Sequence, residues 1–326
     1  FGERLARVDR LDEGEDLGTF VRELLALEES VDGWLAATAH GTVPGLQGTA
    51  DPLSARQYRV LDGVAFSLER ADVVNAVEDG LRRGAGGPWR VAALELLGGK
   101  ALAEDLSLMV RLLANEEGVA PSEGELRDAF VEVVRGLVSQ GASMEVELSR
   151  LAAAKPSVKR ALLRGVGSAG VPDHLEWLAS HLSKDEPCDV ALQEVARLAP
   201  RATLDQSRAL APAVRPFLQS SDSARRTHAV RALAAFGDER AVPQIIERLD
   251  RAEGAERRAC LGALEKLAGR SLPPTTEAWR SWLAREVAWK EARSEDARMD
   301  LRGEDDARVV AALREIASRR LERERW

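Results

Sequence analysis

The stretch "ARRTHAVRALAAFGDERAVPQIIERL", residues Ala224–Leu249, predicts two amphipathic helices joined by a tight turn. Gly237 is placed to end the first helix in the left-handed conformation that glycine adopts easily. Pro243 stands in the first turn of the second helix, where its missing N–H is tolerated. Apolar side chains follow a helical spacing in both halves, at Ala229, Val230, Leu233, Phe236, Ile245, Ile246 and Leu249. A hairpin this short cannot bury both apolar faces alone, so we expect neighbouring copies.

The same order of helix, turn and helix recurs along the chain. The clearer copies are residues 89–114, 157–182 and 255–283, with helix ends expected at Gly98-Gly99 and at Gly167, and the weaker ones are 56–83, 126–154 and 188–218. The apolar residue before each turn serves as a ruler: Leu61, Leu94, Val134, Leu163, Val195, Leu233 and Leu264. Successive steps are 33, 40, 29, 32, 38 and 31 residues, near the period of helix-pair repeats.

The pattern Ala232-Leu233, Phe236-Gly237-Asp238, Ala241-Val242-Pro243 and Leu249 resembles the HEAT-repeat family, specifically its short bacterial, phycobilin-lyase-type repeats. This resemblance covers roughly residues 53–290 and implies an all-α fold, an α-solenoid of about seven HEAT-like helix pairs with terminal helical extensions. We expect residues 1–52 to form an N-terminal acidic helical cap containing one long helix over 15–38. Residues 291–326 are expected to form a charged helical C-terminal extension that resembles the start of a further repeat.

Charge and composition narrow the classes of partner. Net charge is −8, and residues 1–40 alone hold ten acidic residues against four arginines. Such a balance disfavours nucleic acid and anionic lipid, which are bound through Lys and Arg. No apolar run approaches the ~20 residues of a membrane span. The chain begins at Phe1 without a signal peptide pattern, so the cytoplasm is the default compartment, with an exported and processed form as the alternative. Cys188 and Cys260 fall in different helical units and are expected to be free, partly buried thiols.

Catalytic motifs are not found. One HEAT enzyme, deoxyhypusine hydroxylase, binds iron through His-Glu dipeptides, and none of the four histidines here is followed by Glu. Phosphate-binding glycine loops, CxxC pairs and serine nucleophile elbows are also missing. We therefore expect a protein without catalysis, cofactor or metal. The alternative is a lyase-type HEAT enzyme or accessory subunit that holds a small molecule in its concave groove.

His174, Trp177 and His181 lie at positions i, i+3 and i+7, which places them on one stripe of a helix. A zinc site would need more ligands than two imidazoles. Packing against a neighbouring repeat is the favoured interpretation of this stripe, and partner binding is the second.

Trp279, Trp282 and Trp289 form another stripe, around Leu283. Tryptophans of this kind anchor partners at interface hot spots. The favoured alternative is that they close the last repeat and hold the charged C-terminal segment against it.

The HEAT resemblance also implies that second helices line the concave side of the array. Expected there are Asp173, His174, Trp177, Gln244, Glu247 and Arg248. Five arginines of successive first helices form either a small positive stripe or a solvated face paired with nearby Glu and Asp, the second being favoured: Arg225, Arg226, Arg231, Arg257 and Arg258. The sequence thus predicts a non-catalytic scaffold or adaptor for a protein or peptide, a structural subunit of a larger assembly, or a homo-oligomer. The candidate contacts are His174, Trp177, His181, Gln244, Glu247, Arg248, Trp279, Trp282 and Trp289.

Overall fold

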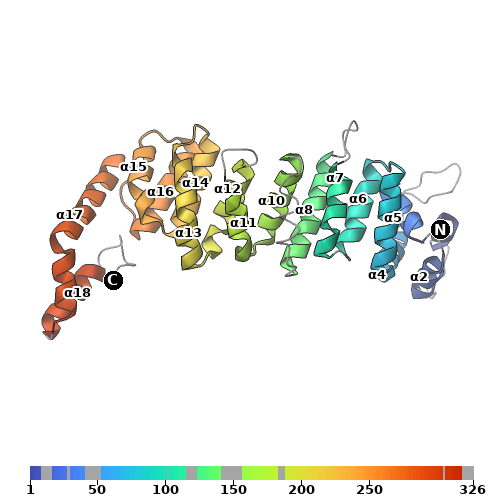
Figure 1. The fold of residues 1–326 in the computed structure, drawn as a ribbon, viewed down its shortest axis with the longest axis horizontal. Helices are drawn as coiled ribbons and strands as arrows, with labels where there is room; N and C mark the ends of the chain where they lie inside the picture. Colours follow the sequence, from blue (N-terminus) through green and yellow to red (C-terminus); the bar gives the residue numbers. More distant parts are fainter. Residues whose placement is uncertain are drawn as a thin grey trace. The chain divides into compact units, whose positions relative to one another are not determined.

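The computed structural model describes residues 1–8, 17–27, 30–40, 53–100, 102–114, 123–140, 156–182, 188–303 and 305–317. Within these residues all regular structure is helical, and no β-strand occurs (Figure 1). The chain divides into two compact units, Phe1–Val171 (unit 1) and Pro172–Trp326 (unit 2). None of its described helices is both long enough and apolar enough to cross a membrane. The predicted all-α solenoid class is confirmed.

Unit 1 is built from helices that pack in succession. They are α1 (Gly2–Arg7), α2 (Leu17–Leu25), α3 (Ser30–His40), α4 (Ala55–Ser67), α5 (Arg70–Arg82), α6 (Gly87–Gly98), the 3-10 turn η2 (Ala103–Asp105), α7 (Leu106–Ala114), α8 (Glu123–Ser139) and α10 (Pro156–Ala169). Helix α8 packs against both α6 and α10. Gly98 and Gly165 lie at these two contacts, where an added Cβ would come within 2.6 Å of Val133 or Val134. The small residues therefore let neighbouring helices approach closely.

Unit 2 contains two layers of helices (Figure 1). The elements are η4 (Pro172–His174), α11 (Leu175–Ser180), α12 (Cys188–Leu198), η5 (Ala199–Arg201), α13 (Leu204–Val214), η6 (Arg215–Gln219), α14 (Ser223–Phe236), η7 (Glu239–Ala241), α15 (Val242–Leu249), α16 (Gly254–Ala268), α17 (Thr276–Leu301) and α18 (Asp306–Ala317). The first helices α12, α14 and α16 pack on one another, and the second helices α11, α13 and α15 lie against them. Helix α17 packs on α15 and on α18.

The predicted hairpin at residues 224–249 is present as α14, η7 and α15. Gly237 has φ +70° and ψ 26°, the left-handed conformation expected at the helix end. The Asp238 N–H donates to the Leu233 carbonyl over 2.9 Å, which satisfies one of the last carbonyls of α14. Pro243 lies in the first turn of α15, as predicted. The apolar faces of both helices are buried, with Val230, Leu233, Ile245 and Leu249 each 0% exposed.

Two helix boundaries differ from the prediction. The single helix expected over residues 15–38 is two helices, because α2 packs on α4 whereas α3 packs on α6. The helix expected to end at Gly167 continues to Ala169. Gly167 is buried within α10, and Gly170, with φ +77°, follows the end of the helix.

The domain limits expected after residues 52 and 290 stay a prediction. Helix α17 runs unbroken from Thr276 to Leu301, across the limit placed at residue 290. The described part of residues 1–52 belongs to unit 1, where α2 packs on α4 and α3 packs on α6. Residues 318–326 and the second half of the copy at 126–154 lie outside the described residues.

Candidate functional site

A cleft of about 580 Å³ opens in unit 2 between α13 with η6, the turn that joins α14 to α15, and α17. Its apolar lining is Ala211, Pro212, Phe236, Pro243, Leu283, Val287 and Trp289. Its charged lining is Arg208, Arg215, Asp238, Glu239, Arg240, Glu286, Lys290 and Arg298. Among these described residues five are basic and three acidic, an excess of two positive charges in a chain whose net charge is −8.

A bidentate ion pair fixes the turn that forms one wall of the cleft. Arg215 of η6 donates from Nε and Nη2 to the two carboxylate oxygens of Asp238, over 2.6 and 2.9 Å. The Asp238 side chain is 6% exposed, so this carboxylate is committed to Arg215. Hydrogen bonding to Asp238 raises the pKa of the Arg215 guanidinium, which therefore stays charged. This wall is thus preorganised by contacts inside the unit.

Three buried tryptophans pack along α17, the helix that forms the second wall of the cleft. Thr275 caps the helix by accepting a hydrogen bond from the Ala278 N–H over 3.3 Å. Trp279 and Trp282 are 0% and 2% exposed and meet edge to face, with ring centroids 5.7 Å apart. Trp289 lines the cleft and donates from Nε1 to Glu315 of α18 over 2.6 Å. The burial of Trp279 and Trp282 favours the packing interpretation of the tryptophan stripe.

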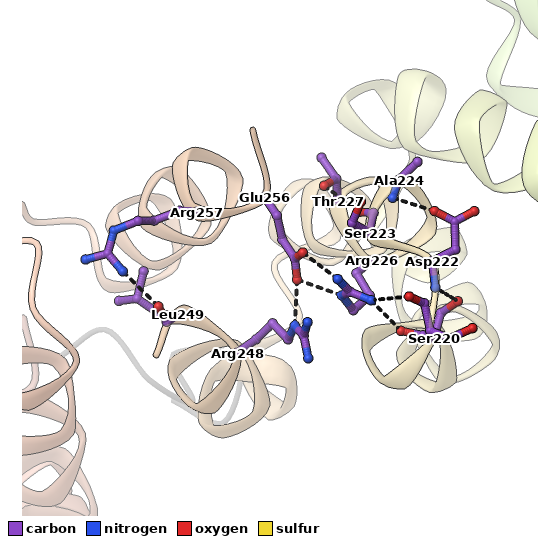
Figure 2. Close-up of polar contacts among 11 residues, drawn as sticks. Ser220, Asp222, Ser223, Ala224, Arg226, Thr227, Arg248, Leu249, Glu256 and Arg257 are labelled. Carbon is purple, nitrogen blue, oxygen red and sulfur yellow. Dashed lines mark hydrogen bonds and ion pairs between the residues drawn. The ribbon is translucent and has the colours of Figure 1, made fainter. Parts of the chain in front are cut away.

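Away from the cleft, at the start of α14 and the end of α15, a buried charge network joins α14, α15 and α16 (Figure 2). Arg226 donates from Nε and Nη2 to Glu256, over 2.7 Å each, and from Nη1 to the carbonyls of Ser220 and Ser221. Arg248 donates from Nε to the same carboxylate over 2.6 Å. The hydrogen bond from Arg226 is the main reason why the pKa of Glu256 is lowered.

This network changes the interpretation of two arginines. Arg226 is paired with a carboxylate, as the favoured alternative for the arginine stripe predicted, but it is buried and does not belong to a solvated face. Arg248, a predicted partner contact, uses its Nε in an internal ion pair and does not line the cleft.

His174, Trp177 and His181 do not share one helix as predicted, because His174 lies in η4 and His181 follows the end of α11, and none of them lines the cleft. The Trp177 and His181 rings lie 4.6 Å apart at a tilt of 56°, and His181 Nδ1 is 2.9 Å from the Trp177 carbonyl oxygen. Partial burial lowers the pKa of His174. No group of three His, Cys, Asp or Glu residues that could hold a metal occurs in the described part of the chain.

Of the remaining predicted contacts, Gln244 is half-buried on α15 and Glu247 is exposed, and neither lines the cleft. Only Trp289 of the nine predicted residues does so among those described. The cleft residues that the sequence analysis missed include Lys290 and Arg298 of α17. Lys290 follows Glu286 by four residues and Arg298 follows it by twelve, a one-sided polar stripe that was readable in the sequence.

Layers of paired helices, with short turns at the end of the layers, define unit 2 as an all-α repeat array. The sequence profile described as HEAT repeats matches residues 182–265, which contain α12 to α15 and most of α16, and this match supports the predicted resemblance to HEAT repeats. A crystal structure of an engineered protein aligns over 97% of this chain and 98% of its own, with a TM-score of 0.40 and 13% identity. No curated protein gives a significant match to this chain.

Proposed function

We propose that this protein is a non-catalytic scaffold that holds a segment of a protein partner in the unit 2 cleft. The observation that carries the proposal is the cleft itself, which combines an apolar lining with an excess of basic side chains in an acidic chain. HEAT repeats support the same reading, because stacked helix pairs form extended binding surfaces.

The residues that line the cleft are better suited to binding a partner than to catalysing a reaction. Among the described residues that line the cleft there is no histidine or cysteine, and one of its carboxylates, Asp238, is bound by Arg215. Val287 is 42% exposed on the α17 wall and offers an apolar contact in a lining that also holds five basic residues. A partner segment with acidic side chains beside an apolar one would match this arrangement.

Charge reversal tests the proposal. The double variant Arg240→Glu and Lys290→Glu changes two cleft residues, and its matched control, Arg251→Glu with Arg258→Glu, makes the same charge change at exposed positions outside the lining. Tagged proteins are used to capture partners from the source cells, followed by quantitative mass spectrometry. We expect the cleft variant to lose captured partner by about tenfold or more, whereas the control retains it.

Two outcomes would contradict this function. Equal capture by the cleft variant and the control would place the partner on another surface. A small molecule retained by the wild-type protein in native mass spectrometry, and lost in the cleft variant, would favour the lyase-type alternative, since a cleft of this volume lies in the range of small-molecule sites.

A further inference from the structure

Unit 1 carries a second concave site, a groove of about 530 Å³ between α4 and α6 with α3 as its floor. Its floor includes Trp34, which is buried and donates from Nε1 to the Leu61 carbonyl over 2.9 Å. That bond joins α3 to α4 and keeps the floor in place. We call this feature the α4–α6 groove.

Exposed aromatic rings line the α4 side of the groove. Tyr58 is 49% exposed and Phe66 is 89% exposed. These positions are eight residues apart with Asp62 midway, so all three lie on one face of α4. A bound partner that covered the Phe66 ring would gain the favourable free energy of burying apolar surface, because folding itself leaves this ring exposed. Aromatic residues are also enriched at protein interfaces.

The charges of the groove are mainly negative. Asp62 on α4 and Glu95 on α6 are exposed, and neither forms a hydrogen bond or ion pair with any residue that the structure describes. Partial burial raises the pKa of Glu95, the effect of desolvation without a compensating cation. Lys100, the basic residue of the lining, donates Nζ to the Phe66 carbonyl over 2.9 Å.

We propose that the α4–α6 groove binds a cationic side chain, Arg or Lys, from a flexible segment of a protein partner. The aliphatic stem of that side chain would pack on Tyr58 and Phe66, whose ring faces also attract a cation. Its charge would meet Asp62 and Glu95. A neutral ligand would bury two carboxylates without compensation, and a polyanion such as nucleic acid would be repelled by them.

This inference concerns a site in the other unit and does not depend on the function proposed for the unit 2 cleft. The charge-reversal variant of Arg240 and Lys290 leaves the α4–α6 groove unchanged. The two proposals can therefore fail separately.

The probe is a fluorescent peptide library with a fixed central arginine and randomised flanking positions, together with the same library carrying citrulline. Citrulline keeps the shape of arginine and removes its charge. Binding to the full chain is measured by anisotropy at low ionic strength. We expect saturable binding of selected arginine peptides, and about tenfold weaker binding of their citrulline counterparts.

Variants of the protein locate the binding. Asp62→Asn with Glu95→Gln should weaken it about tenfold. The control Asp72→Asn with Glu125→Gln, also exposed carboxylates of unit 1, should leave it within about twofold. Phe66→Ala should also weaken peptide binding, because it removes one of the two aromatic rings on which the cationic side chain packs. Folding should stay intact, because the exposed Phe66 ring supports no core. Equal effects of groove and control pairs, equal binding of citrulline peptides, or no saturable binding by any library member would each overturn the proposal.

Discussion

Replacing Glu256 with glutamine tests the buried network that joins α14, α15 and α16. The wild-type carboxylate accepts three charged hydrogen bonds, two from Arg226 and one from Arg248. Glutamine keeps one oxygen but places an NH₂ donor where the second oxygen stood. One arginine donor would then face another donor in a site where the side chains are 6% and 10% exposed.

The size of the effect follows from burial and from the bonds that remain. Removing one partner of a buried ion pair costs about 3–5 kcal/mol. Arg226 keeps its bonds to the Ser220 and Ser221 carbonyls, so we expect the lower end, about 3 kcal/mol. For a unit of this size that loss lowers the midpoint of unfolding by about 6–12 °C.

Hydrogen exchange of the α14 and α16 amides is the suitable assay, because it measures the free energy of local opening where the network lies. The control is Asp296→Asn, which breaks an exposed pair with Arg293 and should change stability by less than about 1 kcal/mol. If E256Q and the control have equal effects on α14 and α16, the network does not stabilise this region and the reasoning is refuted.

E256Q also tests how the stability contributed by Glu256 depends on pH. The folded pKa of Glu256 is lowered from its ordinary value of 4.5 by the hydrogen bond from Arg226. Its contribution to stability is therefore complete above pH 4.5 and is lost as the pH falls through the folded pKa. The stability difference between wild type and E256Q should be constant near neutrality and shrink in acid. A difference that grows on acidification would contradict the assignment.

Three further predictions concern single positions in unit 2. Gly237→Ala should lower the free energy of unfolding in urea by about 1 kcal/mol, because alanine is strained at a φ of +70°. No atom lies within 4 Å of the added Cβ, so the loss would come from the backbone conformation and not from a clash. An unchanged urea midpoint would contradict this explanation. Leu264→Ala, at a position 0% exposed in α16, should cost about 2–5 kcal/mol in the same assay, and a loss under about 1 kcal/mol would argue against a packed core there. Burial raises the pKa of Cys260 to about 11, and Cys188 is buried too. Both thiols should react with a chromogenic disulfide reagent only in denaturant, and fast reaction of the native protein would refute their burial.

Local signals explain why the α14–α15 hairpin could be predicted. Gly237 and Pro243 act within a few residues of their own position, and the apolar spacing before the glycine and after the proline is unambiguous. At residues 15–38 the local pattern misled, because the break between α2 and α3 depends on two different packing partners. In α10 two glycines lie near the helix end, and the sequence did not distinguish Gly167, which is buried within the helix, from Gly170, which follows it with φ +77°.

The cleft was harder to foresee, because its walls come from separate parts of the sequence. Arg215 lies 23 residues before Asp238, and only the fold brings their side chains together. The tryptophan stripe was visible in the sequence, and all three of its indoles are buried. Which of them borders the cleft depends on how α17 packs on its neighbours, and only Trp289 of the three is in the lining.

Site-specific photo-cross-linking tests the central claim, that a protein partner occupies the unit 2 cleft, most directly. A photoreactive amino acid is placed at Val287, in the cleft lining, or at Glu247, exposed on α15 outside it, and cells are irradiated before purification. The scaffold account predicts a discrete protein adduct from position 287 that is absent or much weaker from position 247. Adducts of equal yield from both positions, or from position 247 alone, would contradict it.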